Sequence, residues 1–155
     1  MSNGEVQPMV NFTVAGRLRS LRQPDDMSCW ATVATILRSW QTDIDETIED
    51  VVASAGPRFI EILKSGDGLH HEDLPAFLEA MHLTAEPPMS FGVDGFEKLL
   101  RAHGPLWIVG DEDPGPRFSE HARVLFGLRG DGSPENTLAF LIDPARGTRA
   151  TETVT

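Results

Sequence analysis

The residues best suited to chemistry in this sequence surround its single cysteine, Cys29, which stands in the segment QPDDMSCW at positions 23–30. A cysteine thiolate is a strong nucleophile, and it needs a base and a group that orients the base. Ser28 is a plausible N-cap for a helix that begins at the cysteine, and the free N–H groups and dipole of a helix N-terminus lower a thiol pKa. This position favours reactivity. Taken alone, however, a lone cysteine is more often buried as a small apolar side chain, so a reactive Cys29 requires partners elsewhere in the sequence.

The best candidate for the base among the five histidines is His121. It opens a predicted strand over residues 121–128, and a turn over 129–136 leads to a second predicted strand over 137–142 that ends at Asp143. Neighbouring antiparallel strands place the first residue of one beside the last residue of the next. We therefore expect His121 and Asp143 to be lateral neighbours, with the carboxylate fixing the tautomer of the imidazole.

The elements that position these residues change from helices to strands along the chain. Apolar residues at helical spacing predict a helix from the cysteine to about residue 40 and further helical segments at 45–53, 59–63, 72–81 and 93–103. Alternating or short apolar runs predict strands at 9–14, 106–109, 121–128 and 137–142, with a loop at 110–119. Helices followed by antiparallel strands are typical of an α+β fold, which is the fold class that the sequence predicts.

Composition narrows the classes of function. The 155 residues suit one domain over 1–155, with residues 1–20 as an irregular or strand-like lead-in. The net charge of −11 disfavours nucleic acids and anionic membrane surfaces as partners. A lone cysteine excludes an internal disulfide. No segment reads as a secretory signal or a membrane span, so we expect a cytoplasmic chain, with export by a machine that reads no such signal left open.

One cluster has residue types that bind metals, namely His70-His71-Glu72-Asp73. Adjacent histidines at a helix start point in different directions, and no H-E-x-x-H spacing follows. The helix dipole alone explains acidic residues in a first turn. We therefore expect no metal site and no cofactor. His82 and His103 each stand near a predicted helix C-terminus, where histidine is common.

The segment around Cys29 resembles the active-site segment of the papain-like cysteine proteases. In that family a glutamine lies six positions before the nucleophile, as Gln23 does here, and Cys29 is followed by Trp30 and Ala31. The plant enzymes carry Cys-Gly-Ser before the nucleophile, whereas this chain has Asp-Met-Ser at positions 26–28.

The resemblance continues to Gly147. The run HARVLFG at 121–127 is similar to the strand that carries the family's histidine, and Ile142-Asp143-Pro144 is similar to the strand end that carries its orienting residue. Compact bacterial branches, among them secreted effector proteases and bacteriocin-leader peptidases, are also similar in the segment GPLW at 104–107.

The resemblance implies a papain-like fold, in which an N-terminal helical half with the nucleophile's helix packs on a C-terminal antiparallel sheet and the cleft lies between them. It implies that Cys29 is the nucleophile, His121 the base and Asp143 the orienting group. The side-chain amide of Gln23 and the backbone N–H of Cys29 would donate to the oxyanion. A cysteine endopeptidase acting on protein substrates follows, and the compact branches imply a bacterial effector or toxin with a cognate inhibitor or immunity protein.

Two alternative functions stay open at this point. The same Cys-His-Asp arrangement can deamidate glutamine or transfer acyl groups, because all three reactions pass through a thioester. The fold can also serve as a binding module without catalysis, since a fold does not by itself determine a function.

Overall fold

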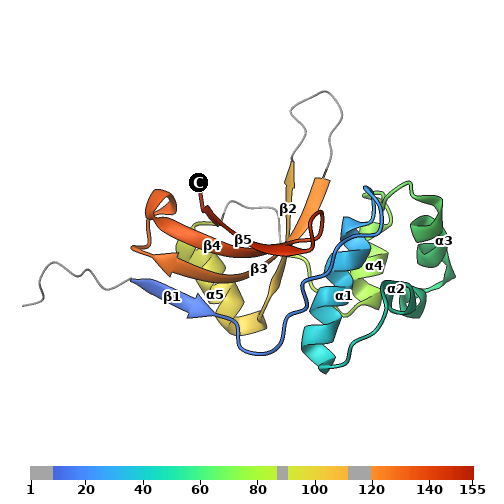
Figure 1. The fold of residues 1–155 in the computed structure, drawn as a ribbon, viewed down its shortest axis with the longest axis horizontal. Helices are drawn as coiled ribbons and strands as arrows, with labels where there is room; N and C mark the ends of the chain where they lie inside the picture. The colour runs from blue at the N-terminus through green and yellow to red at the C-terminus, as the bar shows by residue number, and fades with distance from the viewer. Residues whose placement is uncertain (1–8, 87–90, 112–119) are drawn as a thin grey trace, which may run out of the picture.

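The computed structural model describes residues 9–86, 91–111 and 120–155. It places most of its helices on one side and an antiparallel sheet on the other, with the helix over Val93–His103 packed against the sheet (Figure 1). The lead-in before residue 9, the Pro87-Pro88 break and residues 112–119 of the predicted loop lie outside the described residues. The prediction of an α+β fold is confirmed.

The helices of the described residues lie close to the predicted ranges. They are α1 (Cys29–Thr42), α2 (Ile48–Ala55), α3 (Pro57–Ser65), α4 (Leu74–Ala80) and α5 (Val93–His103). The start of α2 is later than predicted because Thr47 caps it, with its hydroxyl oxygen accepting a hydrogen bond from the N–H of Asp50 at 3.1 Å.

The sheet is built around one long strand. Its members are β1 (Val10–Thr13), β2 (Leu106–Asp111), β3 (Glu120–Gly130), β4 (Thr137–Asp143) and β5 (Thr148–Thr153). The order is β1-β3-β4-β5, and β2 also pairs with β3, so β3 is shared by three antiparallel partners. The first half of β3 pairs with β2 and its last four residues pair with β1. The sequence did not predict β5.

Helix α1 is the element that joins the two halves. Its Val33, Ile36 and Leu37 pack against β3 and β4, while Trp30 and other residues on its second side pack against α2, α3 and α4. The Trp30 ring meets the fully buried Phe77 ring edge to face at 5.0 Å, so Trp30 is a core residue. A helix buried on both sides has little freedom to move, so its first residue is held firmly between the helices and the sheet.

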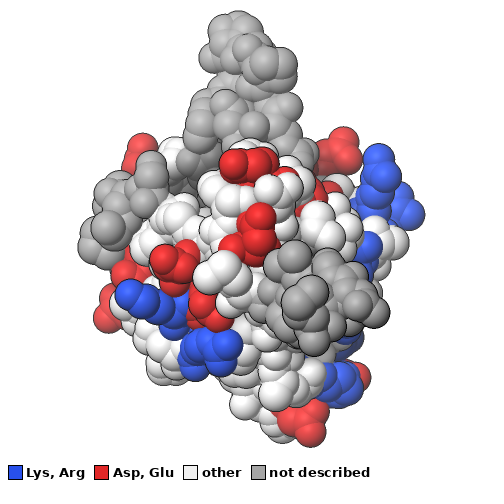
Figure 2. Space-filling model, turned by 90° about the vertical axis from the view of Figure 1, so that its left-hand side faces the viewer, with Lys and Arg blue, Asp and Glu red and all other residues white. Residues whose placement is uncertain are grey.

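The surface carries charges of both signs. Acidic and basic side chains of the described residues are interspersed on the face at the sheet end of the molecule (Figure 2). Among the described helices, none has the length and apolar character needed to cross a membrane.

Candidate active site

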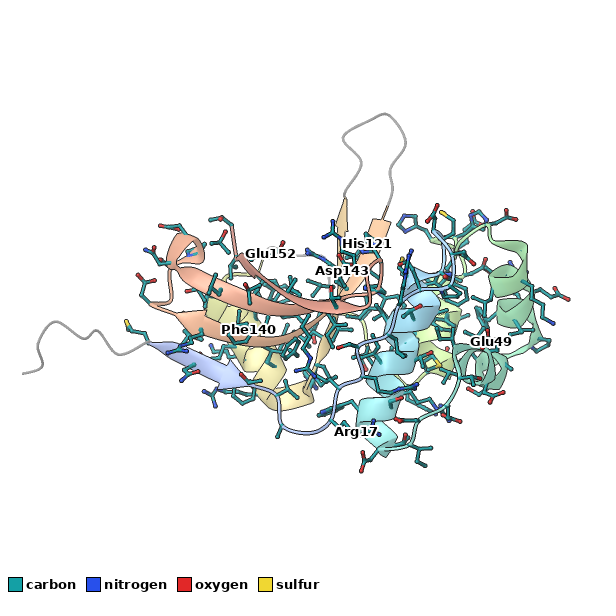
Figure 3. All side chains as sticks on the ribbon, in the orientation of Figure 1. Arg17, Glu49, His121, Phe140, Asp143 and Glu152 are labelled. Atoms are coloured by element: carbon teal, nitrogen blue, oxygen red, sulfur yellow. The ribbon has the colours of Figure 1, made fainter. Side chains whose placement is uncertain are left out.

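His121 and Asp143 meet at the edge of the sheet that faces α1 (Figure 3). Val124 pairs with Ile142 in the register of β3 and β4, which places His121 diagonally across from Asp143. Diagonal neighbours are within reach of long side chains. The Nε2 atom of His121 lies 2.7 Å from Oδ1 of Asp143, which confirms that the two residues are lateral neighbours.

The Asp143 carboxylate is held in its ionised form. Burial alone would raise its pKa, but the hydrogen bond from His121 and the bond from the N–H of Ala145 at 2.9 Å outweigh burial, and the nearby positive charge of Arg123 adds to them. The net result is a pKa below the ordinary value of aspartate. An ionised carboxylate only accepts hydrogen bonds, so Nε2 of His121 carries the hydrogen and Nδ1 is the atom that can accept a proton.

Cys29 lies beside the first residues of β3. It is 8% exposed and belongs to the same buried cluster as Ala122, the neighbour of His121 in the chain. The backbone of Ala122 and the charge of Asp143 both act on its thiol. The structure therefore brings Cys29, His121 and Asp143 to one place, although they are up to 114 positions apart in the sequence.

The prediction of a lowered thiol pKa is wrong. Burial raises the pKa of Cys29, the negative charge of Asp143 adds to the increase, and hydrogen bonds from the backbone of Ala122, Trp30 and Cys29 itself oppose it without reversing it. The sequence argument considered only the helix N-terminus, whose effect is real but smaller than the cost of placing a thiolate in this apolar cluster. The resting thiol is therefore neutral at neutral pH.

The loop at residues 25–28, just before α1, is stabilised by hydrogen bonds among its own residues. The hydroxyl of Ser28 donates to the carbonyl of Asp25 at 3.1 Å and accepts from the N–H of the same residue at 3.2 Å. Ser28 occupies the N-cap position as predicted, but its side chain bonds to the loop and not to the first amides of α1. The N–H of Met27 donates to Oδ1 of Asp25 at 2.9 Å. These bonds fix the conformation of the loop that leads into Cys29.

Gln23 is anchored next to the same site. Its backbone N–H donates to the carbonyl of Pro144, the residue after Asp143, at 2.7 Å. Its side-chain Oε1 is enclosed and has no hydrogen-bond partner among the described residues. A half-buried side chain with an enclosed carbonyl is not an ordinary surface glutamine.

The other candidates do not assemble into a site. Within the described part of the chain, no group of three or more histidine, cysteine, aspartate or glutamate residues could hold a metal ion. His82 and His103 line a separate pocket beside β2.

A buried cysteine at a helix N-terminus beside a His-Asp pair on an antiparallel sheet defines a thiol hydrolase of papain-like architecture. A comparison with protein families gives the family itself. Residues 10–155 match the family described as papain-like cysteine protease AvrRpt2, and the chain belongs to that family. Searches of curated proteins and of solved structures found no match.

Family membership confirms the resemblance to papain-like cysteine proteases and the papain-like fold. The protein is a peptidase of the thiol protease class, and its substrates are proteins.

Proposed function

We propose that Cys29, His121, Asp143 and Gln23 carry out peptide-bond hydrolysis in this protein. The observation that supports this most directly is the 2.7 Å contact between His121 and Asp143, next to a cysteine that the Ala122 backbone contacts. The nucleophile, the base and the orienting group then stand in the order that the reaction requires.

The reaction begins from a neutral thiol. Nδ1 of His121 removes the proton from Sγ of Cys29 as the sulfur attacks the peptide carbonyl carbon, and the carbonyl oxygen becomes an oxyanion. The protonated His121 then gives its proton to the leaving amine, and a thioester remains on Cys29. Water, deprotonated by His121, attacks the thioester, the C–S bond breaks to release the acid, and His121 returns the proton to Sγ of Cys29. Burial raises the pKa of Cys29, which favours transfer of the proton as the sulfur attacks.

The oxyanion is stabilised by two donors, the side-chain amide of Gln23 and the backbone N–H of Cys29. Removal of one such donor costs about 2.7–4 kcal/mol of transition-state stabilisation, which is roughly 10²–10³ in kcat. The bond between the Gln23 backbone and Pro144 fixes the residue on the rim of the site.

The test compares Cys29→Ala and His121→Ala with His70→Ala, which replaces an exposed histidine between α3 and α4. We expect the first two variants to lose hydrolysis of unfolded β-casein and the third to keep it, with equal circular dichroism in all of them. Equal activity in all three variants would refute the assignment. A mass increase of about one dalton on intact casein, without fragments, would show deamidation in place of proteolysis, because OH replaces NH₂ at the acyl carbon.

We further propose that the protein is a bacterial effector that cleaves proteins of another cell and is restrained by a cognate inhibitor or immunity protein in its producer. The description of the family names the papain-like cysteine protease AvrRpt2. The compact length of this chain, 155 residues, also suits the role. Expression of the wild type in a foreign host should reduce growth, whereas Cys29→Ala should not. Equal growth with both proteins would contradict the toxin role.

A further inference from the structure

Strand β2 has an open edge. It pairs with β3 from Leu106↔Leu125 to Asp111↔Glu120, and no other strand of the described residues pairs with it. β1 lies on the same side of β3 but pairs only with its far end, from Gly127 to Gly130. Within the described part of the chain, this edge of β2 therefore has no strand partner, although residues 82–86 line the same pocket as β2. Proteins usually cover or block such an edge.

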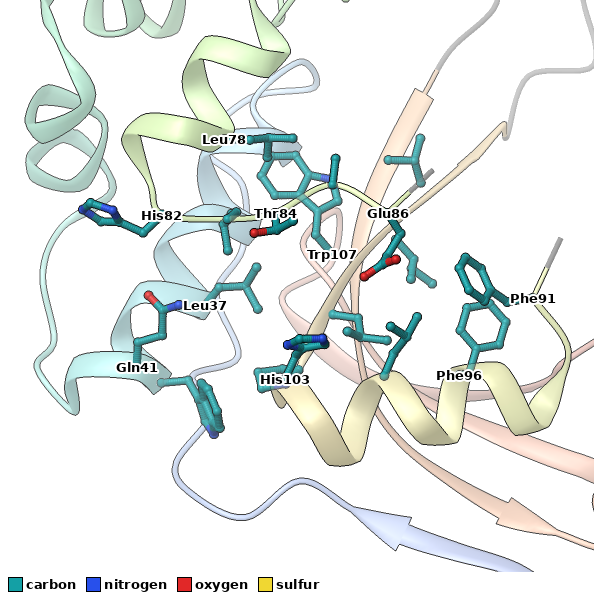
Figure 4. A pocket seen from close by; sticks show the side chains of 18 of the residues that line it. Leu37, Gln41, Leu78, His82, Thr84, Glu86, Phe91, Phe96, His103 and Trp107 are labelled. Carbon is teal, nitrogen blue, oxygen red and sulfur yellow. The ribbon is translucent and has the colours of Figure 1, made fainter. Parts of the chain in front are cut away.

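An apolar groove of about 630 Å³ follows this open edge. Four consecutive β2 residues, 106–109, line it together with Leu78 of α4 and Phe96 of α5. Figure 4 shows Leu78 and Phe96 on opposite sides of the strand, with Trp107 between Leu78 and the strand. The groove therefore has a strand edge along its length and an apolar wall against each face of the sheet.

The two walls fit the side-chain pattern of an extended peptide. Successive residues of a strand point to opposite faces of a sheet. β2 itself shows this alternation, because Trp107 packs against the clusters beneath α1 and α4, whereas Leu106 and Ile108 pack against the cluster beneath α5. A strand added to β2 would direct alternate side chains toward Leu78 and toward Phe96.

The groove also leads toward the catalytic residues. Val109, which lines it and is 49% exposed, pairs with Ala122, and the next residue of β2 pairs with His121. Strands lie about 4.8 Å apart, so a chain bound at the open edge of β2 would run about 10 Å from the strand of His121. One substrate polypeptide can therefore occupy the groove with one segment and the catalytic residues with another.

We propose that the open edge of β2 and this groove bind an extended, apolar segment of the protein substrate as an added β-strand, away from the bond that is cleaved. Backbone hydrogen bonds supply affinity and the two apolar walls supply selectivity for alternating apolar side chains. The occupant is polypeptide because the protein is a peptidase and because a strand edge is complementary to an extended backbone. The inference rests on the proposed function, since it places the scissile bond at Cys29.

The test measures hydrogen exchange of the full chain carrying Cys29→Ala, with and without excess β-casein, an unfolded protein rich in apolar segments. We expect the peptide covering residues 106–109 to exchange about tenfold more slowly when casein is present, since its outward amides become hydrogen-bonded. Val109→Lys should remove this protection, because lysine on an open edge opposes strand addition. Leu138→Lys is the matched control, because Leu138 is 41% exposed on β4, outside the groove.

Unchanged exchange at β2 in the presence of casein, or equal loss of protection in both lysine variants, would overturn the proposal. Hydrolysis of casein by the wild type is measured separately. If casein is hydrolysed without protecting β2, the groove proposal fails and the catalytic proposal stands. If casein protects β2 but the wild type does not hydrolyse casein, the catalytic proposal fails and the groove remains a binding site.

Discussion

Gly147 is the residue whose substitution tests the positioning of Gln23 most sharply. It follows Asp143 in the turn between β4 and β5, and its φ of +68° lies in the left-handed region. A Cβ at this position would lie 2.8 Å from Cβ, 2.9 Å from N and 3.0 Å from Cα of Arg22. Two of these are backbone atoms, so Gly147→Ala must displace the chain at Arg22 and, with it, the adjacent Gln23.

The magnitudes separate an effect on stability from an effect on catalysis. Alanine in the left-handed region costs about 1–2 kcal/mol. Weakening the bond from the Gln23 N–H to the Pro144 carbonyl adds about 0.5–1.5 kcal/mol. If the Gln23 amide leaves the oxyanion, the transition state loses about 2.7–4 kcal/mol, which is roughly 10²–10³ in kcat. We therefore expect a folded variant whose activity falls much further than its stability.

The assay compares casein hydrolysis, urea unfolding and iodoacetamide labelling of Cys29 in Gly147→Ala and Gly66→Ala. Gly66 is a matched control, because its φ is +74° and a Cβ there would meet no heavy atom within 4 Å. Both variants should lose similar backbone stability, but only Gly147→Ala should lose hydrolysis, and Cys29 labelling should be unchanged in both. Equal hydrolysis by the two variants would refute the role of Gly147. Loss of labelling together with hydrolysis would show damage to the nucleophile and not to Gln23.

Three further predictions concern pH and packing. The pKa of Cys29 is raised, so its iodoacetamide labelling should increase with pH through a midpoint above about 8.5. The free energy of unfolding should include the full contribution of the buried neutral thiol below about pH 8.5, the pKa of a free thiol. This contribution should be lost as the pH rises through the raised pKa of the folded protein. Asp143→Asn should move the labelling midpoint down, because it removes a negative charge that raises this pKa; an upward shift would contradict the assignment. Gly104→Ala should destabilise the fold by about 2–5 kcal/mol in urea unfolding, because its φ is +86° and the new Cβ would overlap the Trp40 ring. Gly132→Ala, at φ +95° with open space around it, is the control and should cost only the backbone term.

The sequence was most informative where local signals are strong. Helix α5 was predicted with its observed bounds because Gly104-Pro105 marks its end and its apolar residues recur at helical spacing. β5 was missed because every one of its residues is exposed, so no alternation of apolar and polar side chains marks it. Its pairing with β4 depends on the turn at Gly147, which lets the chain reverse.

The geometry of the site was also predicted only in the parts that depend on local sequence signals. His121 and Asp143 were predicted as neighbours because a hairpin fixes which residues of two strands meet. The sign of the Cys29 pKa shift was predicted wrongly, because burial depends on side chains such as Phe126 and Ile142, which are distant in sequence. The groove beside β2 was invisible for a related reason, since it is formed by α4, α5 and β2 together.

The turn that follows β4 holds both the proposed base, His121, and the proposed oxyanion donor, Gln23. Asp143, at its start, accepts the hydrogen bond from His121, and the carbonyl of Pro144 accepts the one from the Gln23 backbone. A displacement of this turn would therefore disturb the base and the oxyanion donor together. Gly147→Ala acts from the far end of the turn, where it contacts Arg22 and not His121. The substitution should therefore displace Gln23 before it affects His121. It can separate the role of the oxyanion donor from the role of the base, which a change at Asp143 would alter together.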